Sequence, residues 1–330
     1  MLLISFGTRP EYIKLKPVIE SIKGKIPYKL LFTGQHVDLL SEIDGDIQEL
    51  EIENGNNRLD SIVQSVMNSE DIFTDISAVL VQGDTTSVFA VALAAFHRKI
   101  KIVHLEAGFR TWNKYHPYPE EFNRCAVSRM ADIHLCPTAN SASNLENERV
   151  NGKIHVVGNT VLDNLVGIPT LYDKHIIVTM HRRENHDNMD AWFKKINNLA
   201  KEYDEYEFII PLHPNPNVQK HRHLLTNLTV VDSMEHASFI KKLASSHLVI
   251  TDSGGIQEES SFFKKKCIVC REHTERGEGL EVFSFLASEE TMEGVFRDLV
   301  EDNIPSGDCP YGDGKSAERI TKILIEELKF

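Results

Sequence analysis

The sequence predicts an α/β protein made of two doubly wound halves, each built on a parallel sheet with helices on both faces. Short apolar runs alternate with helical segments in the first half, at residues 1–6, 28–33, 78–83, 100–106 and 153–158. The same alternation returns in the second half, at residues 175–180, 206–212, 228–233, 248–253 and 266–271. This rhythm is typical of βαβ units, whose parallel strands are buried on both faces of the sheet.

The boundary between the halves falls in the segment "VGIPTLYDKH", residues 166–175, which combines Pro and Gly with a change of charge. We place residues 1–168 in an N-terminal domain and residues 169–314 in a C-terminal domain. A chain of 330 residues with 41% hydrophobic content can bury a core in each. Ligands of open α/β sheets bind beyond the carboxyl ends of the strands, so two such sheets facing each other would form a deep cleft.

The composition excludes several kinds of partner. A net charge of −13 leaves no basic footprint for nucleic acid, so an anionic ligand needs a locally basic pocket. The longest apolar run, residues 88–96, is well short of the roughly 20 residues that span a bilayer. The N-terminal segment lacks the basic and apolar regions of a signal peptide. We therefore expect a cytoplasmic protein with no nucleic-acid or membrane partner.

The five cysteines predict neither a disulfide framework nor a metal site. Their number is odd, and no second CxxC completes a zinc set. Cys267 and Cys270 lie in an apolar, strand-like run, where residues three apart point to opposite faces. We expect both to pack in the core, as free cysteines often do.

The stretch "LVITDSGGIQEESSFF", residues 248–263, predicts a buried strand, a glycine turn and a helix start. The unpaired N–H groups at Ser253, Gly254 and Gly255 would bind an anion, helped by the helix dipole. Glu258 and Glu259 follow at once, although a like-charge contact at ~4 Å costs about 1 kcal/mol in water and about 4 at a dielectric near 20. Glu259 lies ~7 Å along the helix, a position that suits a carboxylate accepting from ribose hydroxyls beside the phosphates.

A second anion site is predicted by "SFGTRPEYIK". Gly7 relaxes the turn after the strand, Pro10 suits the start of a helix, and Arg9 and Lys14 flank that start. The alternative is an ordinary strand-to-helix turn with two solvated basic side chains.

A group of carboxylates is predicted in the first half. Asp84 and Glu106 end successive strands, so we expect them to share one rim of the cleft, and Glu120 and Arg124 open a helix nearby. The alternatives are structural: Asp84 can cap the following helix, and acidic residues in a first helical turn complement the helix dipole.

Histidine and arginine side chains follow two strands of the second half. "TMHRREN" places His181 and two arginines at a strand end, and "PLHPNPNV" places His213 at the next. The spacing between His181 and His186 is not that of a helical metal-binding pair. Beside an anion site, such side chains can instead stabilise a leaving phosphate.

Together these segments resemble those of the non-hydrolysing UDP-N-acetylglucosamine 2-epimerases, which adopt the two-domain GT-B fold of many glycosyltransferases. The matching strings run in order from about residue 5 to 315 and include "FGTRPEYIKLKPVI", "GDTTSVFAVALAAF", "HLEAGFRT", "YPEEFNR", "HRREN", "HPNPNV", "TDSGGIQEE" and "PYGDG".

The resemblance implies a role for each matching residue. The positions implicated in catalysis are Asp84, Glu106, Glu120 and His181. The positions that bind substrate are Arg9, Lys14, Arg124, His213, Met234, Phe239, Ser253, Gly254, Gly255, Glu259 and Arg276. In that second set Glu259 takes the ribose, and Phe239 and the backbone at Met234 take the uracil. Residues from about 315 to 330 would form a helix that packs back onto the N-terminal domain.

The resemblance also implies the reaction. The family eliminates UDP from the sugar to form a glycal and adds UDP back after a proton returns to the other face of C2. We therefore expect a UDP-sugar substrate, no cofactor and no metal, a homodimer, and a role in supplying sugars for cell-surface polysaccharide. The alternatives are a hydrolase that releases N-acetylmannosamine and UDP, a GT-B glycosyltransferase, and a non-catalytic sensor of UDP-sugars.

Two departures from the family pattern stand out. The family's "TERPE" is "TERGE" here, at residues 274–278. Bacterial members bind a second, activating UDP-N-acetylglucosamine with a segment that includes Gln35, and Asp38 would repel its diphosphate. We therefore expect weak or absent activation by substrate.

Overall fold

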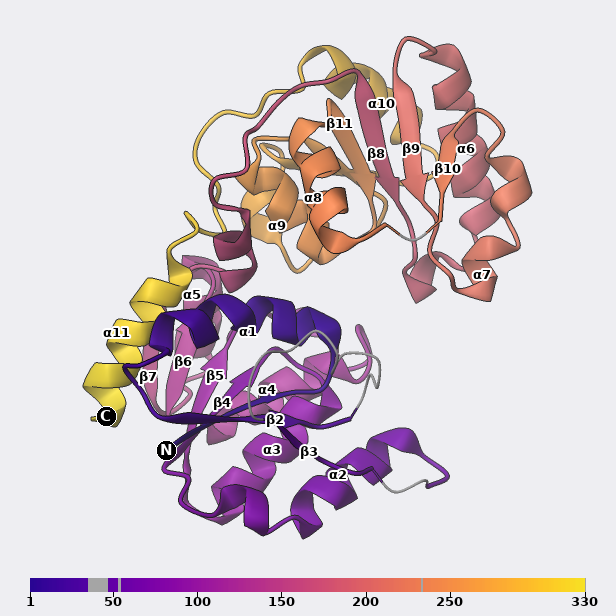
Figure 1. Ribbon diagram of the computed structural model, residues 1–330. Helices are drawn as coiled ribbons and strands as arrows, with labels where there is room; N and C mark the ends of the chain where they lie inside the picture. Colours follow the sequence, from indigo (N-terminus) through magenta and orange to yellow (C-terminus); the bar gives the residue numbers. More distant parts are fainter. Residues whose placement is uncertain (35–46, 53–54, 233, 330) are drawn as a thin grey trace. The chain divides into compact units, whose positions relative to one another are not determined.

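A computed structural model of the chain describes residues 1–34, 47–52, 55–232 and 234–329 (Figure 1). The chain divides into two compact units, one formed by Met1–Asn164 with Gly312–Phe330 and the other by Leu165–Tyr311. Each unit contains a parallel sheet with helices packed on it, so the predicted doubly wound α/β class is confirmed. Gln35 and Asp38, assigned to a second ligand site, lie outside the described residues.

The sheet of the first unit has seven parallel strands within the described ranges, in the order β3-β2-β1-β4-β5-β6-β7. These strands are β1 (Leu2–Phe6), β2 (Tyr28–Phe32), β3 (Ile47–Glu49), β4 (Ala78–Gln82), β5 (Lys101–Leu105), β6 (Ile133–Cys136) and β7 (Lys153–Val156). The chain order reverses between β1 and β4, and open α/β sheets bind ligands outside the carboxyl ends of the strands at such a reversal.

Helices cover both faces of this sheet. Alternate strand residues such as Leu2 and Ile4 join a core with α1 (Arg9–Ile22) and α11 (Ser316–Leu328), which pack against each other in Figure 1. Leu3 points to the opposite core. That core also receives α2 (Arg58–Asn68), α3 (Thr86–His97) and α4 (Glu120–Met130), while α5 (Ala139–Asn147) packs on β6 and β7.

The last helix is tied to the first unit through its N-terminus. The carboxylate of Asp163 accepts hydrogen bonds from the N–H groups of Ser316 and Ala317, at 3.1 and 2.7 Å. An acidic side chain at this end of a helix satisfies unpaired amides and complements the helix dipole. Ile320 and Leu324 then bury the inner face of α11, each contributing roughly 1.5–3 kcal/mol.

The sheet of the second unit has six parallel strands in the described ranges, in the order β10-β9-β8-β11-β12-β13. They are β8 (His175–Thr179), β9 (Glu207–Pro211), β10 (Thr229–Val231), β11 (Leu248–Thr251), β12 (Cys267–Val269) and β13 (Ser284–Leu286). Its helices are α6 (Met189–Glu202), α7 (Pro216–Gln219), α8 (His236–Ser245), α9 (Gly254–Phe262) and α10 (Met292–Glu301). The chain order reverses between β8 and β11.

Aromatic side chains fill the core under α6 and α10. Phe208 of β9 stacks on Phe296 of α10 with ring centroids 5.7 Å apart, and Phe193 of α6 is fully buried beside them. Cys267 and Cys270 are buried free thiols, which confirms their predicted packing in the core.

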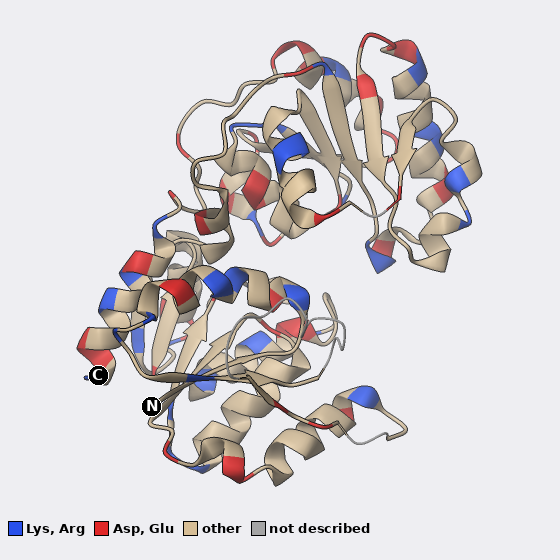
Figure 2. Cartoon of the chain, viewed as in Figure 1, with Lys and Arg blue, Asp and Glu red and all other residues tan. Residues whose placement is uncertain are grey.

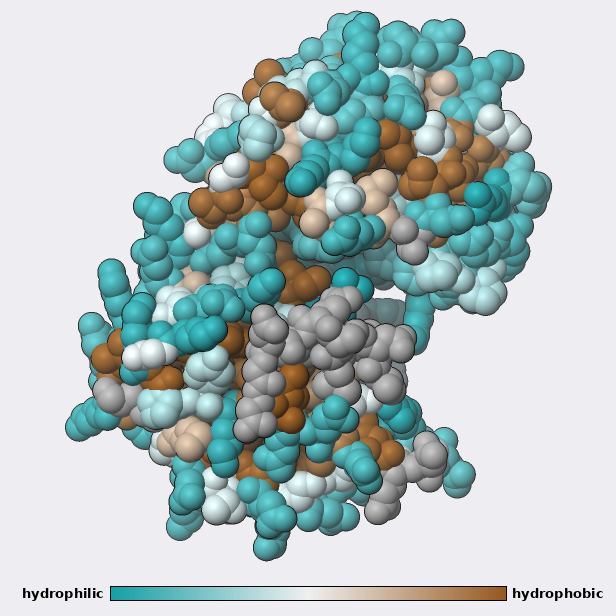
Figure 3. Space-filling model, viewed as in Figure 1, coloured by the Kyte–Doolittle hydropathy of each residue, from teal (hydrophilic) through white to brown (hydrophobic). Residues whose placement is uncertain are grey.

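Charged and apolar residues are mixed on the outside of both units. Lys and Arg residues are interspersed with Asp and Glu residues (Figure 2), and hydrophilic residues cover most of the face in Figure 3, with apolar patches between them. None of the helices in the described part of the chain combines the length and apolar character that a membrane span requires.

Candidate functional site

Glu106 lies directly after β5 in the first unit, with its carboxylate almost completely enclosed. The side chain is 8% exposed, and its Oε2 atom lies 2.5 Å from the Nζ atom of Lys14 on α1. The side-chain amide of Gln82, the last residue of β4, also donates to Oε2, and Asn159 donates to Oε1 at 3.5 Å. The residue has a φ of 62°, in the left-handed region that costs a non-glycine residue of order 1–3 kcal/mol. Such strain is common at functional sites because it aims a side chain that an extended strand would not.

Asp84 lies just beyond the carboxyl end of β4, next to the end of β5. Its carboxylate accepts hydrogen bonds from Nε and Nη2 of Arg124 on α4, the bond from Nε being 3.1 Å long. Its backbone carbonyl accepts a hydrogen bond from the side-chain amide of Asn123 at 2.9 Å. The Asp84 side chain remains 30% exposed, whereas the Arg124 side chain is 5% exposed. A buried cation thus fixes a carboxylate that still reaches solvent.

The buried histidine of β5 supports the same strand end. His104 is fully buried, and its Nε2 atom lies 2.8 Å from the carbonyl oxygen of Gly83. Burial lowers the pKa of His104 to about 3, so the ring is neutral and donates its Nε2 proton to this carbonyl. This hydrogen bond fixes the turn that carries Asp84.

The two glutamates at the start of α4 have different surroundings. Glu120 is the first residue of the helix and is half-buried. Glu121 is buried; its Oε1 atom accepts from the N–H groups of Thr111 and Trp112, and its Oε2 atom lies 3.2 Å from Arg124. Glu121 therefore organises the preceding loop and the arginine of Asp84, a role that the sequence did not predict.

The turn between β1 and α1 donates its amide hydrogen bonds to a carboxylate of the protein itself. Thr8 caps α1 in a capping box with Glu11, whose Oε2 atom accepts from the N–H groups of Gly7 and Thr8 at 2.5 and 3.1 Å. The amides that were expected to hold a ligand anion thus donate to Glu11. Arg9, the first residue of the helix, is exposed beside them.

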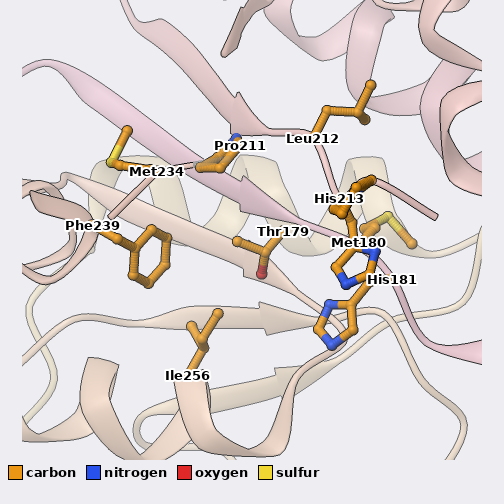
Figure 4. Close-up of a pocket in the computed structure, with 10 residues that line it drawn as sticks. Thr179, Met180, His181, Pro211, Leu212, His213, Met234, Phe239 and Ile256 are labelled. Atoms are coloured by element: carbon orange, nitrogen blue, oxygen red, sulfur yellow. The ribbon is translucent and has the colours of Figure 1, made fainter. Parts of the chain in front are cut away.

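A cavity of about 230 Å³ opens at the carboxyl ends of β8 and β9 in the second unit (Figure 4). Its walls come from the ends of these strands, the loop before α8 and the start of both α8 and α9. The lining residues are Thr179, Met180, His181, Pro211, Leu212, His213, Pro214, Met234, Phe239 and Ile256. The largely apolar walls and the planar rings suit a flat, weakly polar group such as a nucleobase.

Two histidines border this cavity as a stacked pair. The rings of His181 and His213 have centroids 5.3 Å apart and planes 16° apart. Desolvation lowers the pKa of His181, and the nearby Asp252 carboxylate, 3.5 Å from its Nδ1 atom, opposes this shift. His181 is therefore expected to be mainly neutral at neutral pH.

Asp252 was not predicted as a site residue, yet it shapes this part of the site. Its fully buried carboxylate accepts from the N–H groups of His181 and Arg182, at 3.0 and 2.9 Å, and from the side chain of Asn185 at 3.1 Å. The signal in the sequence was its position directly after a buried strand, which it shares with Asp84.

The start of α9 differs from the start of α1. Among the described residues the Ser253 side chain makes no capping hydrogen bond at the start of α9, in contrast to the capping box of α1. The guanidinium of Arg276 packs on Gly254, where an added Cβ atom would lie 2.9 Å from the Cζ atom of the arginine. This arrangement brings together a helix N-terminus and a cation, as an anion site requires.

Arg276 is held by two acidic residues. Its Nε atom lies 2.9 Å from Glu258, which is fully buried, and its Nη1 atom contacts Glu275. The arginines around Glu275 hold the pKa of that carboxyl far below its usual range, against the effect of burial. Glu259, by contrast, lies 3.8 Å from His236 and does not share the partner of Glu258. The adjacent glutamates thus have separate purposes.

The structure brings the predicted residues together in four groups. These are Lys14 with Glu106, Asp84 with Arg124, the cavity set His181, His213, Met234 and Phe239, and the α9 set Ser253, Gly254, Gly255, Glu259 and Arg276. Among the residues that the structure describes, no group of His, Cys, Asp and Glu side chains is arranged to hold a metal ion.

Sequence comparisons match this chain over almost its whole length. A family model described as UDP-N-acetylglucosamine 2-epimerase matches residues 21–325. The UDP-N-acetylglucosamine 2-epimerases of Neisseria meningitidis serogroup A and Bacillus subtilis are 36% and 35% identical to this chain; each match covers 98% of the chain, and 99% and 94% of the relatives.

Solved structures match as closely. The crystal structure of UDP-GlcNAc 2-epimerase from Neisseria meningitidis bound to UDP-GlcNAc superposes with a TM-score of 0.88 at 34% identity, covering 98% of this chain and 99% of that one. Acinetobacter baumannii MurG, at 12% identity and a TM-score of 0.58 over 99% of this chain and 98% of its own, shares the fold alone.

Proposed function

The chain belongs to the UDP-N-acetylglucosamine 2-epimerase family, and we propose that it interconverts UDP-N-acetylglucosamine and UDP-N-acetylmannosamine, or a related UDP-N-acetylhexosamine pair. The reaction would proceed by elimination of UDP to a glycal and its re-addition, without hydrolysis. The relatives named for this activity cover the chain almost from end to end.

The observation that carries this proposal is the pair of carboxylates at the ends of neighbouring strands. Asp84 lies just beyond β4 and Glu106 directly after β5, and the two strands pair in parallel. Each carboxylate is held by a cation, Asp84 by Arg124 and Glu106 by Lys14. Inversion at C2 needs one group to remove a proton and another to return one to the opposite face, so two carboxylates on one rim suit the chemistry.

Elimination is favoured over direct proton removal because of the substrate's chemistry. The hydrogen at C2 of such a sugar is not acidic until the bond from C1 to the diphosphate oxygen breaks. The departing diphosphate then needs positive charge and amide donors, which the uncapped start of α9 and Arg276 would supply. His181, mainly neutral, would donate a hydrogen bond to the leaving oxygen, and Glu120 would act as a further acid or base.

The remaining predicted residues would bind the nucleotide. We assign the uracil to the cavity between Phe239 and Met234, the ribose to Glu259, and the diphosphate to His213, Arg9 and the turn of Ser253–Gly255. No step in this scheme uses a nicotinamide or a metal.

The finer biological expectations belong to the same proposal. We propose a cytoplasmic homodimer that supplies sugars for cell-surface polysaccharide. Trp112, Tyr118 and Phe122, near the start of α4, are exposed aromatic side chains that would offer apolar surface to a second copy. Sedimentation equilibrium would test the dimer.

Proton NMR of a panel of UDP-N-acetylhexosamines, incubated with the purified protein, tests the function directly. We expect the H2 signal of one substrate to decline while that of its C2 epimer grows to a constant ratio. Release of free N-acetylmannosamine and UDP would show a hydrolase instead, and no change with any substrate would overturn the proposal.

A further inference from the structure

Glu11 is a buried carboxyl group that the proposed chemistry does not use. The residue is 4% exposed, and its Oε2 atom accepts from the N–H groups of Gly7 and Thr8. Its Oε1 atom is buried and has no hydrogen-bond partner among the described atoms. A buried carboxylate with an unsatisfied oxygen is costly, so the group gains from holding a proton there.

The neighbouring strand brings further charge to this carboxyl. β1 pairs with β4, with Ser5 opposite Val81, so the turn after β4 adjoins the turn that contains Glu11. That turn contains Asp84 and Thr85, and the charge of Asp84 and the hydroxyl group of Thr85 act on the Glu11 carboxyl. Asp84 is paired with Arg124 of α4. On its own helix α1, the charged neighbours of Glu11 are Arg9 and Lys14, and Lys14 contacts Glu106 of β5.

These surroundings bring the pKa of Glu11 close to neutral pH. Burial raises its pKa to about 7, and the charge of Asp84 adds to the rise. The hydrogen bonds from Gly7, Thr85 and Thr8 oppose it. At neutral pH the Glu11 carboxyl is therefore present in both its protonated and its ionised form, so the turn next to Arg9 carries either no charge or one negative charge.

We propose that Glu11 is a positioning residue that holds the Gly7–Thr8 turn and takes up a proton when the diphosphate of the UDP-sugar binds at Arg9. This inference rests on the proposed function. An ionised Glu11 behind the turn repels the incoming diphosphate, whereas a protonated Glu11 does not, so binding selects the protonated form. The proton comes from solvent and forms an O–H bond at Oε1, and no other bond changes.

Two consequences distinguish this role from a purely structural one. Binding takes up protons near and above the pKa of free Glu11, about 7, and takes up none well below it, where Glu11 is already protonated. Affinity for the UDP-sugar falls as the pH rises through the same range, by about threefold to tenfold for one like charge at partly screened distance.

Isothermal titration calorimetry with UDP-N-acetylglucosamine, in two buffers of different ionisation enthalpy, measures this proton uptake. We expect the wild-type protein to take up a fraction of a proton at about pH 7.5 and none from Glu11 at about pH 5.5. Glu11→Gln keeps an acceptor for the two amides and should lose that uptake, with an affinity that changes less than about twofold between pH 6 and 8. Glu20→Gln, an exposed change on the same helix, should behave as wild type.

The difference between wild type and Glu11→Gln removes contributions from histidines, which both proteins share. Equal proton uptake in the two proteins would overturn this inference and leave the proposed function standing. Absence of UDP-sugar binding in wild type would overturn both. The affinity series needs no variant: loss of charge from histidines also weakens binding as pH rises, so a wild-type affinity that stays constant or increases between about pH 6 and 8 contradicts the proposal even if Glu11→Gln fails to fold.

Discussion

The ammonium group of Lys14 lies 2.5 Å from the carboxylate of Glu106, although the two residues are 92 positions apart in the chain. Lys14 stands on the first helix, and Glu106 directly follows β5, which β4 separates from β1 in the sheet. With the Glu106 side chain 8% exposed and that of Lys14 19% exposed, the contact is only weakly screened by water. The lysine thereby supplies the enclosed carboxylate with a positively charged partner.

We predict that Lys14→Gln lowers kcat by about tenfold to a hundredfold and changes substrate affinity by less than about threefold. Without Lys14, the enclosed Glu106 carboxylate loses its charged partner and is held less firmly in the position of a base. Steady-state rates and direct binding of UDP-sugar measure the two effects separately. Lys16→Gln, an exposed change on the same helix, should have no effect. Weaker binding with an unchanged kcat would instead assign Lys14 to the diphosphate.

The adjacent glycines at the start of α9 should respond oppositely to alanine. At Gly254 an added Cβ atom would lie 2.9 Å from the Arg276 guanidinium, so we expect Gly254→Ala to lower the free energy of unfolding by about 1–3 kcal/mol and to weaken UDP binding. At Gly255 the same atom meets only the Ser253 hydroxyl, at 4.0 Å. Gly255→Ala should leave stability unchanged or raise it by about 0.5–1 kcal/mol. Urea unfolding measures both, and equal losses would argue against Arg276 as the cause.

Lys265 should make stability depend on pH in the second unit. Its buried ammonium lies 3.2 Å from the ring centroid of Tyr172 and donates to the carbonyl of Leu171. Burial lowers its pKa to about 7, against 10.5 for an ordinary lysine. Between these values the unfolded chain binds more protons than the folded one, so the contribution to stability rises as pH increases from about 7 towards 10.5. Lys265→Met should remove that rise.

Urea midpoints of wild type and Lys265→Met at several pH values from about 7 to 9 test this prediction. The stability of the wild type relative to the variant should increase with pH across the series. Lys242→Met, on the neighbouring exposed surface of α8, is the matched control and should track the wild type. A constant difference between wild type and Lys265→Met would show that the ammonium stays charged throughout.

Much of the fold follows from local pattern. Strands such as β1 and β8 are continuous apolar runs followed by helices, and burial of both sheet faces requires that pattern. The free, buried Cys267 was predicted for the same reason. By contrast, the attachment of α11 through Asp163 joins residues 154 apart, and no local signal in either segment specifies that pairing.

The site residues also fall into those that the sequence pattern locates and those that it does not. Residues directly after strands, such as Asp84 and His181, could be located because parallel strands deliver their carboxyl ends to one edge. Partners could not be located, because they depend on side-chain geometry between distant elements. The turn after β1 was expected to bind a ligand anion, but its amides donate to Glu11, and Glu258 proved to be the partner of Arg276. Charge type alone does not tell a carboxylate that serves the substrate from one that serves an arginine.

The mechanism makes a prediction about the hydrogen at C2. If a carboxylate such as Glu106 or Asp84 removes this proton, the group that returns one to the other face can exchange with water. Product formed in D2O should then carry deuterium at C2, which NMR or mass spectrometry detects. Glu106→Gln should slow incorporation and epimer formation together, since one step produces both. Transfer of a hydride would retain the original hydrogen, but no GxGxxG follows a strand in this sequence to bind a nicotinamide.

Elimination of UDP also predicts cleavage of the bond between C1 and the diphosphate, which proton exchange at C2 alone does not. The bond between C1 and the diphosphate oxygen must break, and the freed outer phosphate of UDP can rotate before it adds back. Oxygen-18 placed in the glycosidic bridge should therefore appear in non-bridging positions of that phosphate, at a rate no faster than cleavage of the C1–O bond. Deuterium at C2 without any scrambling of oxygen would have two explanations: the outer phosphate cannot rotate, or the C1–O bond does not break. Detection of released UDP and of the glycal would show that the bond does break. Epimer formed in D2O with protium fully retained at C2 would rule out both carboxylates as the base.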